Sequence, residues 1–207
     1  MNEVEYFTKN RPEDCYRVLM RQIGIVSGKR VLDVGCGDGR FVKYLRDNGC
    51  QADGIEILDE FRIKARNEYG VGLYTDFNNL PAKVYDHVIF ISSLQYMKNP
   101  GSYIIEAKNR LTGGGMLYLE IPNDDALIYK FIRLFRSEYL PEYQINIFTR
   151  QGIKKILADI GFKNIRIEIS GVSSGGKPKK FKSAYRAVIF IGRLLRMGHL
   201  MMVKAGL

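Results

Sequence analysis

The sequence predicts an α/β fold with a single domain, in which strands and helices alternate along the chain. With 207 residues and an apolar fraction of 46%, the chain can form one domain with a full core. An apolar run at 31–34 leads into a glycine-rich turn and then into residues with helical apolar spacing. Further apolar runs at 50–57 and 85–91 have the lengths of strands, and the second is typical of a buried central strand.

The first expected element is a helix that begins near Asn10 and continues to about Gln22. Asn10 can cap its N-terminus, and Pro12 suits its first turn. Its apolar face consists of Tyr16, Leu19, Met20 and Ile23. We predict a lid or brace over the glycine-rich turn, and packing on the sheet edge alone is the equal alternative.

The glycine-rich turn after the first strand is predicted to bind a ligand. Gly35, Gly37 and Gly39 allow positive φ and a close approach of backbone N–H groups, and the next helix offers its N-terminus. A dinucleotide turn would need glycine where Arg40 stands, and a phosphate loop would need Lys followed by Ser or Thr. Asp33 at the strand end would repel a diphosphate, which favours a cationic or zwitterionic ligand.

The sequence Val-Leu-Asp-Val-Gly-Cys-Gly-Asp-Gly around this turn resembles the first motif of class I S-adenosylmethionine-dependent methyltransferases. In that family the loop cradles the methionine part of the cofactor. The resemblance therefore implies cofactor contacts at Asp33, Gly35, Cys36 and Gly37. It covers nearly the whole chain and implies a three-layer Rossmann-like sandwich. The implied seven-stranded mixed sheet has the order 3-2-1-4-5-7-6, with the last strand antiparallel.

The second strand ends in an acid, Glu56, which lies 23 positions after Asp33. This spacing fits one helix and one strand, so both acids should reach the carboxyl edge of neighbouring parallel strands. An acid there can bind both hydroxyls of a ribose, and the alternative is a solvated acid at a strand end. The position also resembles the family's second motif, in which Ile57 would pack on the adenine.

The next elements are a helix capped by Asp59 that continues to about Tyr69, and a short third strand at 71–74. Asp76 and Phe77 follow in a loop that matches the family's third motif. A carboxylate beside an aromatic side chain suits adenine, because the acid can accept from its exocyclic amine. Asp76 as a turn former is the alternative.

The central strand at 85–91 is followed by Ser92, which is a further cofactor-binding candidate. His87 lies inside the strand and is expected to be a packed or partnered core histidine. A related subgroup of the family has Leu-Glu-His after this strand. Here Gln95 and Tyr96 replace the two ionisable residues. If the acid or histidine of that subgroup serves substrate binding or proton transfer, this chain must achieve that step in another way or catalyse different chemistry.

Asn99 is predicted to cap a helix that reaches Arg110. A strand is predicted at 116–121, and Pro122 and Asn123 follow directly after it. An amphipathic insertion at about 124–148 is predicted to cap the acceptor pocket, and a helix that only packs on the domain is the alternative. Within it Gln144 replaces a histidine that is common in the family. The acceptor-side candidates, as orienting hydrogen-bond groups and pocket walls, are Gln95, Tyr96, Asn123 and Tyr143.

After a helix capped by Thr149 and a strand at 165–169, the chain becomes strongly basic. Eight Lys and Arg and no acid lie within 171–207, which leaves +2 of the net charge of +10 for the rest. A basic helical insertion at about 171–198 is predicted before a last strand. Its basic ridge could contact an anionic membrane surface or nucleic acid, and the alternative is a solvated ridge on a helix that packs on the domain.

Cysteine and histidine usage predicts no metal site and no disulfide framework. The three cysteines and two histidines match no metal spacing. No leader is recognised at the start, and no run approaches the about 20 apolar residues that span a bilayer. We therefore expect a cytoplasmic protein.

The sequence thus predicts a transferase, an S-adenosylmethionine-dependent methyltransferase with one domain at 1–207. Its predicted acceptor is a small molecule, a sugar or a lipid-linked group, and whether O or N is methylated stays open. One alternative is a catalytically inactive cofactor-binding partner subunit, motivated by the replaced ionisable residues. Another is an RNA methyltransferase or nucleic-acid-binding protein that uses the basic tail.

Overall fold

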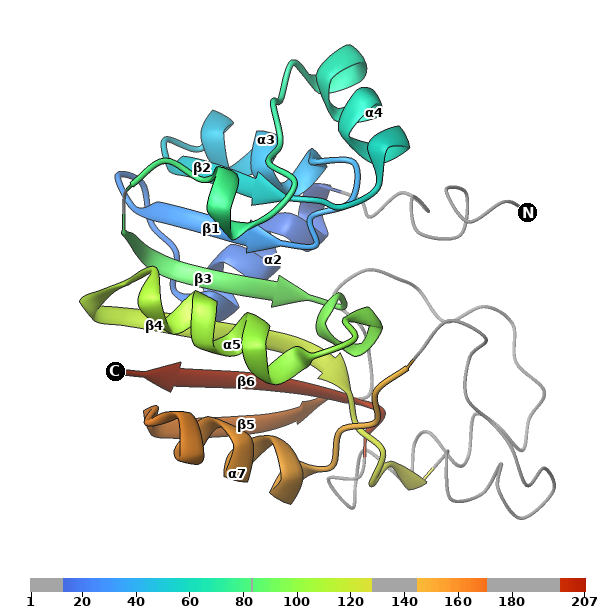
Figure 1. Cartoon of the computed structure of the whole chain (residues 1–207), viewed down its shortest axis with the longest axis vertical. Coiled ribbons are helices and arrows are strands. Elements are labelled where there is room, and N and C mark those ends of the chain that lie inside the picture. The colour runs from blue at the N-terminus through green and yellow to red at the C-terminus, as the bar shows by residue number, and fades with distance from the viewer. Residues whose placement is uncertain (1–12, 83, 128–144, 171–197) are drawn as a thin grey trace, which may run out of the picture.

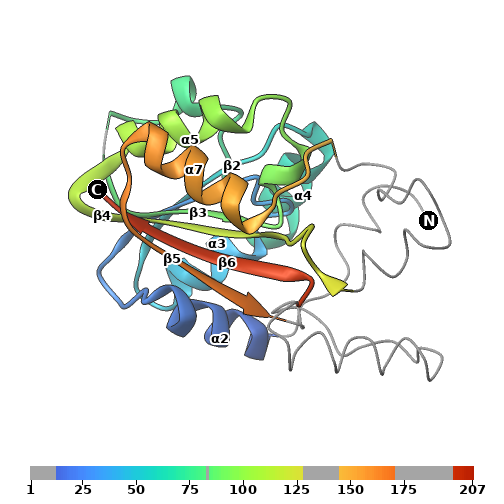
Figure 2. The ribbon, with the colours of Figure 1, turned by 90° about the horizontal axis from the view of Figure 1, so that it is seen from below.

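The computed structural model describes residues 13–82, 84–127, 145–170 and 198–207, which form three layers (Figures 1 and 2). The middle layer is a sheet of six strands: β1 (Arg30–Val34), β2 (Gln51–Ile55), β3 (Tyr85–Ile91), β4 (Leu111–Pro122), β5 (Lys163–Ser170) and β6 (Leu200–Gly206). The helices are α2 (Glu13–Ile23), α3 (Arg40–Asp47), α4 (Asp59–Tyr69), η1 (Phe77–Asn79), η2 (Leu94–Tyr96), α5 (Pro100–Asn109) and α7 (Arg150–Ile160).

The strands lie in the order β2-β1-β3-β4-β6-β5. The first four are parallel, and β6 is antiparallel to both β4 and β5, as predicted for the last strand. The arrowheads of β1, β2 and β3 point to the same side in Figure 1. The predicted ligand-binding residues after these strands therefore share the carboxyl edge of the sheet.

The predicted seven-stranded order is not confirmed, because the segment at 71–74 forms no strand in the described part of the chain. It contributes one isolated parallel bridge, between Tyr74 and Ile55. Tyr74 N donates to Gly54 O at 2.9 Å, and Glu56 N donates to Tyr74 O at 2.9 Å. The segment is short and contains Gly72, so a single pair of hydrogen bonds is all that forms. The six strands that do form keep the predicted sequence of neighbours.

Helix caps explain where several helices begin. Asn99 Oδ1 accepts from Ser102 N at 3.3 Å before α5, and Thr149 Oγ1 accepts from Gly152 N at 3.0 Å before α7, so both predicted caps are confirmed. The predicted cap at Asp59 is wrong, because Asp59 is the first helical residue of α4 and makes no cap bond.

Two apolar clusters, one on each face of the sheet, form the core. One contains Phe90 and Leu119 and packs on α5 and α7, whereas the other contains Ile89 and Tyr118 and packs on α2 and α3. Figure 2 shows α2 on the opposite side of the sheet from α5 and α7. This sandwich holds the strand ends in fixed positions.

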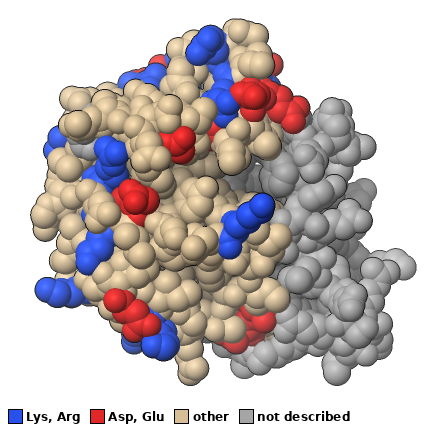
Figure 3. Space-filling view, in the orientation of Figure 1, with Lys and Arg blue, Asp and Glu red and all other residues tan. Residues whose placement is uncertain are grey.

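Several predictions fall outside the described residues: the cap segment from 128 to 144 with Tyr143 and Gln144, the basic segment at 171–197, and the helix start at Asn10. The single domain at 1–207 stays a prediction. Across the described ranges, no helix is long and apolar enough for a membrane span. Nor do three or more His, Cys, Asp or Glu residues gather as a metal site would require, as far as the chain is described. On the face in Figure 3, Lys and Arg side chains are interspersed with acids.

Candidate functional site

The glycine-rich turn connects β1 to α3 in a conformation that depends on glycine. Gly35, Gly37 and Gly39 have φ values of 74°, 58° and 73°, in the left-handed region that side chains with a Cβ disfavour. Gly35 N and Cys36 N donate to Ile55 O at 2.8 and 3.1 Å, which ties the turn to the end of β2. The predicted strand, turn and helix are thus confirmed.

Gly35 packs directly on the loop that follows β3. A Cβ built on Gly35 would lie 2.5 Å from the Cβ of Ser93, a distance that real side chains do not reach. The Ser93 hydroxyl donates to Val34 O at 2.6 Å. The residues after β3 are therefore held beside the turn, where a ligand of the turn would meet them.

Glu56 closes the turn from the neighbouring strand. Its carboxylate is 6% exposed, and its two oxygens accept from Gly37 N at 2.9 Å and from Leu58 N at 3.0 Å. The alternative of a solvated acid is therefore wrong. Burial raises the pKa of Glu56, and the backbone hydrogen bonds oppose that shift. The ribose contact stays a prediction.

Asp33 and Asp38 place two more buried carboxylates at the turn. Asp33 is 3% exposed and pairs in register with Gly54 on β2. Asp38 forms ion pairs with Arg40 at 3.0 Å and with Lys64 of α4 at 3.3 Å, which fasten the turn to two helices.

The thiol of Cys36 lies inside the turn. Burial, assisted by the charges of Asp33 and Glu56, raises the pKa of Cys36 well above its usual value, so the thiol stays neutral. A Cβ on Gly54 would lie 2.6 Å from its Sγ, so the thiol also fills space between the turn and β2.

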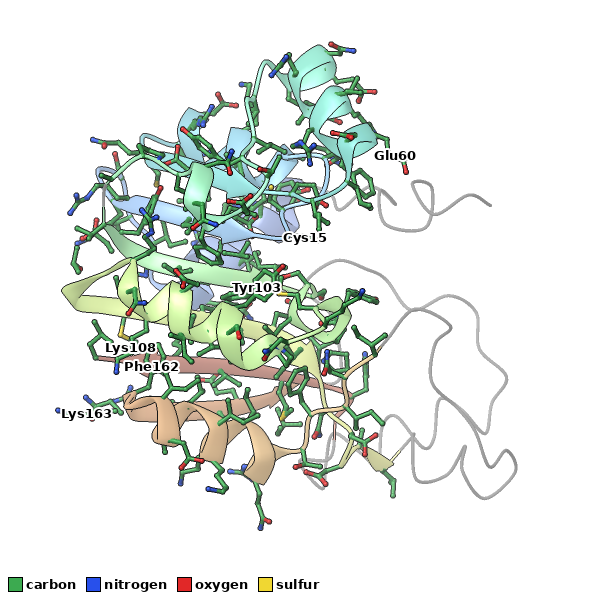
Figure 4. All side chains as sticks on the ribbon, viewed as in Figure 1. Cys15, Glu60, Tyr103, Lys108, Phe162 and Lys163 are labelled. Atoms are coloured by element: carbon green, nitrogen blue, oxygen red, sulfur yellow. The ribbon has the colours of Figure 1, made fainter. Side chains whose placement is uncertain are left out.

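The predicted adenine side is only partly assembled by the structure. Ile57 is 72% exposed, which leaves an apolar surface for a ring to cover. Asp76 instead caps η1, since its Oδ1 accepts from Asn78 N at 2.7 Å, which matches the turn-former alternative. The Phe77 ring is buried with its centroid 6.1 Å from that of Tyr103 on α5 (Figure 4), so its position favours packing over a ligand contact.

Ser92, a predicted cofactor contact, and Gln95, a predicted acceptor-side residue, lie together after β3. Ser92 has a φ of 52°, rare for a residue with a Cβ, and Gln95 Nε2 donates to Ser92 O at 2.9 Å. Gln95 is 2% exposed, and its buried Oε1 has no hydrogen-bond partner among the residues that the structure describes. Tyr96 follows in η2 and is partly exposed. The structure therefore brings these three candidates to one loop beside the turn.

Both polar atoms of the Asn123 side chain form hydrogen bonds with backbone groups. Its Nδ2 donates to Gly198 O at 2.7 Å and its Oδ1 accepts from Asp125 N at 3.2 Å. This arrangement favours a role in holding chain segments together. Its predicted acceptor contact has no support from these bonds.

Sequence reasoning missed Glu120, which is fully buried near the end of β4. Its Oε1 accepts from the Ser92 hydroxyl at 2.8 Å. The available signal was an acid between Leu119 and Ile121 in an otherwise apolar strand. His87, by contrast, lies in the amino half of β3 as a buried core residue, and burial lowers its pKa.

A family model described as a methyltransferase domain matches residues 7–167, a span that contains the turn, Glu56 and Glu120. The chain belongs to this methyltransferase family. The predicted class I S-adenosylmethionine-dependent family and its cofactor are therefore confirmed.

Two curated relatives differ in what they act on. A tRNA U34 carboxymethyltransferase from Alteromonas mediterranea is 25% identical over 166 residues, which are 70% of this chain and 48% of that protein. A ubiquinone biosynthesis O-methyltransferase from Azoarcus is 27% identical over 124 residues, 56% of this chain and 53% of that protein. The chain thus spans about half the length of these relatives.

Two solved structures share the fold. An S-adenosylmethionine-dependent methyltransferase from Archaeoglobus fulgidus has a TM-score of 0.69 and 20% identity, and the match covers 98% of this chain and 97% of that one. A complex of the Haloferax volcanii Trm112 methyltransferase activator with a methyltransferase gives a TM-score of 0.70 and 18% identity, with 97% and 92% covered. Likeness at this identity supports the fold alone.

The residues at the turn of this chain fit S-adenosylmethionine. Each oxygen of the Glu56 carboxylate accepts one backbone N–H, and a carboxylate oxygen has a second acceptor site for a ribose hydroxyl. A Cβ on Gly37 would meet no atom of the described residues within 4 Å, so that part of the chain leaves the backbone of Gly37 open to a ligand. The exposed Ile57 side chain is available to an adenine ring.

Proposed function

We propose that this chain transfers a methyl group from S-adenosylmethionine to an oxygen or nitrogen atom of a small-molecule, sugar or lipid-linked acceptor. The observation that carries the proposal is the hydrogen bond from Gly37 N to the buried Glu56 carboxylate. It joins the glycine-rich turn to a ribose-binding acid at the edge where open α/β sheets bind ligands.

For this reaction the protein mainly has to align the nucleophilic atom of the acceptor with the methyl group of the donor. When bound, S-adenosylmethionine supplies a methyl group on a sulfonium that is already a good leaving group. The turn, Glu56 and Ser92 hold the donor, and Gln95 and Tyr96 face the acceptor. The buried Gln95 Oε1 can accept a hydrogen bond from an acceptor O–H or N–H and so orient its nucleophilic atom.

The donor site is tested by calorimetric titration of S-adenosylmethionine into the purified chain. Asp33→Ala and Glu56→Ala should each weaken binding by about tenfold or more, because each removes a buried carboxylate from the site. Glu60→Gln is the matched control, since Glu60 lies exposed on α4 (Figure 4). Unchanged affinity in both alanine variants would refute the donor site.

The acceptor class is tested by measuring S-adenosylhomocysteine formed with a panel of phenols, amines, sugars and polyprenylated quinols. Turnover with one class, abolished in Asp33→Ala, would support the proposal. Donor binding without turnover on any acceptor would instead favour the inactive partner subunit, an alternative motivated by neutral residues at Gln95, Tyr96 and Gln144.

Methylation of tRNA is the second candidate, favoured by the eight cations and no acid within 171–207. The tRNA enzyme among the relatives is consistent with this candidate. It predicts transfer of labelled methyl groups to bulk tRNA and tRNA binding that weakens steeply with salt. Charge reversal at Lys179, Lys180 and Arg186 should abolish that binding, and no binding of tRNA at low salt would reject the candidate.

A further inference from the structure

Two backbone carbonyls of the donor site lie just beyond the end of β2. Ile55 is the last residue of β2, and its carbonyl accepts from Gly35 N and Cys36 N of the glycine-rich turn. Glu56 and Ile57 follow the strand, so their carbonyls are not part of the ladder between β2 and β1. Each therefore needs a donor from elsewhere in the chain or from water. Their position matters because Glu56 carries the predicted ribose-binding carboxylate and Ile57 carries the side chain available to adenine.

The guanidinium of Arg62, early in α4, supplies that donor to both carbonyls. Its Nη1 donates to Glu56 O at 2.7 Å and to Ile57 O at 2.6 Å, and its Nη2 donates to the carboxylate of Asp59. The Arg62 side chain is 20% exposed, so most of it is shielded from water. Because a guanidinium is planar and its donors point in fixed directions, these bonds hold the main chain of 56–57 in one position against α4.

The formation of α4 alone does not explain an arginine at this position. A cation close to a helix N-terminus opposes the helix dipole, so the helix itself does not favour Arg62 there. The ion pair with Asp59 adds little, because the Asp59 side chain is 85% exposed. Arg62 instead folds back past Leu58, the N-cap of the helix, to the carbonyls of 56–57. Its bonds therefore serve the segment before the helix.

We propose that Arg62 is a positioning residue of the donor site, which fixes the segment 56–57 so that the Glu56 carboxylate is aligned with the ribose. Gly37 N and Leu58 N fix the two carboxylate oxygens, and Arg62 fixes the main chain that carries them. Arg62 acts through Glu56 and needs no contact with the ligand. Loss of its hydrogen bonds leaves the carboxylate in place only on average, and the ribose hydroxyls then lose part of their interaction with it.

The test compares S-adenosylhomocysteine with its 2′-deoxy analogue, which lacks one ribose hydroxyl, by calorimetric titration of the whole chain. A carboxylate aligned with the ribose should make the wild-type chain bind the hydroxylated ligand about tenfold more tightly. Arg62→Met keeps a long unbranched side chain and removes every N–H donor. It should weaken binding of S-adenosylhomocysteine by about tenfold and reduce the discrimination between the two ligands to about threefold or less. A merely structural loss would weaken both ligands by the same factor and leave the discrimination unchanged.

Arg66→Met is the matched control, because it makes the same chemical change on the same helix. Arg66 is exposed and lies in the last turn of α4, about one helical turn farther from the segment 56–57 than Arg62. Its substitution should leave both the affinity for S-adenosylhomocysteine and the discrimination within about twofold of the wild-type values.

The proposal rests on the donor site of the proposed function, but it can fail separately. Unchanged discrimination in Arg62→Met would overturn it, even with weaker binding of both ligands, and would leave the donor site intact. Equal effects of Arg62→Met and Arg66→Met would also overturn it, because they would indicate a general effect of charge. Equal binding of the two ligands by the wild-type chain would overturn the alignment by Glu56 and with it this proposal, and binding of neither ligand would overturn the donor site as well.

A second variant decides if Arg62→Met does not fold. Arg62→Lys keeps the positive charge but replaces the planar fork by a single ammonium, which does not reproduce its geometry. The discrimination should then fall by about threefold. Full wild-type discrimination in Arg62→Lys would overturn the proposal, because charge alone would then be sufficient.

Discussion

Replacing Gly35 by alanine tests how tightly the glycine-rich turn is packed on the loop after β3. The new Cβ would lie 2.5 Å from Ser93 Cβ and 3.0 Å from Ser93 Oγ. Ser93 is 8% exposed and has little room to move, so its hydrogen bond to Val34 O should be lost. The φ of 74° adds a backbone cost that is independent of this collision.

The two costs can be estimated separately. A residue with a Cβ in the left-handed region costs about 1–2 kcal/mol, and the lost hydrogen bond costs about 0.5–1.5 kcal/mol. Gly35→Ala should therefore lower the free energy of unfolding by about 1.5–3.5 kcal/mol. Gly37 has a φ of 58°, and none of the described residues has an atom within 4 Å of a Cβ built on it, so we expect Gly37→Ala to carry only the backbone cost.

Urea unfolding of both variants, of Ser93→Gly and of the double variant Gly35→Ala/Ser93→Gly measures these terms. The loss of unfolding free energy in the double variant should be smaller than the sum of the losses in the two single variants by about 1 kcal/mol, because Ser93→Gly removes the collision with the new Cβ. Gly37→Ala should reduce the binding free energy of S-adenosylmethionine by more than it reduces the free energy of unfolding. Equal stability losses for Gly35→Ala and Gly37→Ala, with no coupling to Ser93, would refute the reasoning.

Further predictions concern pH and two capping side chains. Burial raises the pKa of Glu56 in the folded state. Its contribution to stability is therefore present below about pH 4.3 and is lost as pH rises through the raised pKa. Glu56→Gln should flatten the fall of the urea unfolding midpoint as pH rises through that pKa. Burial lowers the pKa of His87, so its contribution is present above about pH 6.5 and is lost as pH falls, and His87→Leu should flatten that loss in the same titration. Asp76→Ala should lower the free energy of unfolding by about 1 kcal/mol through loss of the η1 cap, and Asp76→Asn by less. Asn123→Ala should lower the free energy of unfolding by about 2 kcal/mol in thermal or urea unfolding, and any loss of turnover should be equal for all methyl acceptors.

The fold and the donor side were largely predictable because their signals are local. The turn at Gly35 follows from spacing of glycines after an apolar run, and Glu56 follows from the length of one helix and one strand. Caps at Asn99 and Thr149 follow from the chemistry of a side-chain oxygen before a helix. Each of these features depends on residues that are close in the sequence.

The features that sequence reasoning left open or missed are decided by individual backbone contacts. Whether Asp76 faces a ligand or caps η1 is decided by the backbone of 77–79, which folds back onto its carboxylate. No third strand forms at 71–74 in the described part of the chain, because Val71 N donates to Ala65 O of α4 at 3.0 Å and a single bridge joins Tyr74 to Ile55. Neither outcome is encoded in a periodic pattern.

Glu120 changes the interpretation of the neutral residues after β3. The replacement of acid and histidine by Gln95 and Tyr96 suggested a site without ionisable groups beside the acceptor. The structure places a buried carboxylate next to the same loop, but on β4, where Ser92 donates to it. A carboxyl group on a sheet strand is held more rigidly than one on a loop, so its hydrogen bond with Ser92 fixes the loop before a ligand binds. The acceptor side of the loop is therefore positioned by β4 and not by an acid or histidine of the loop itself.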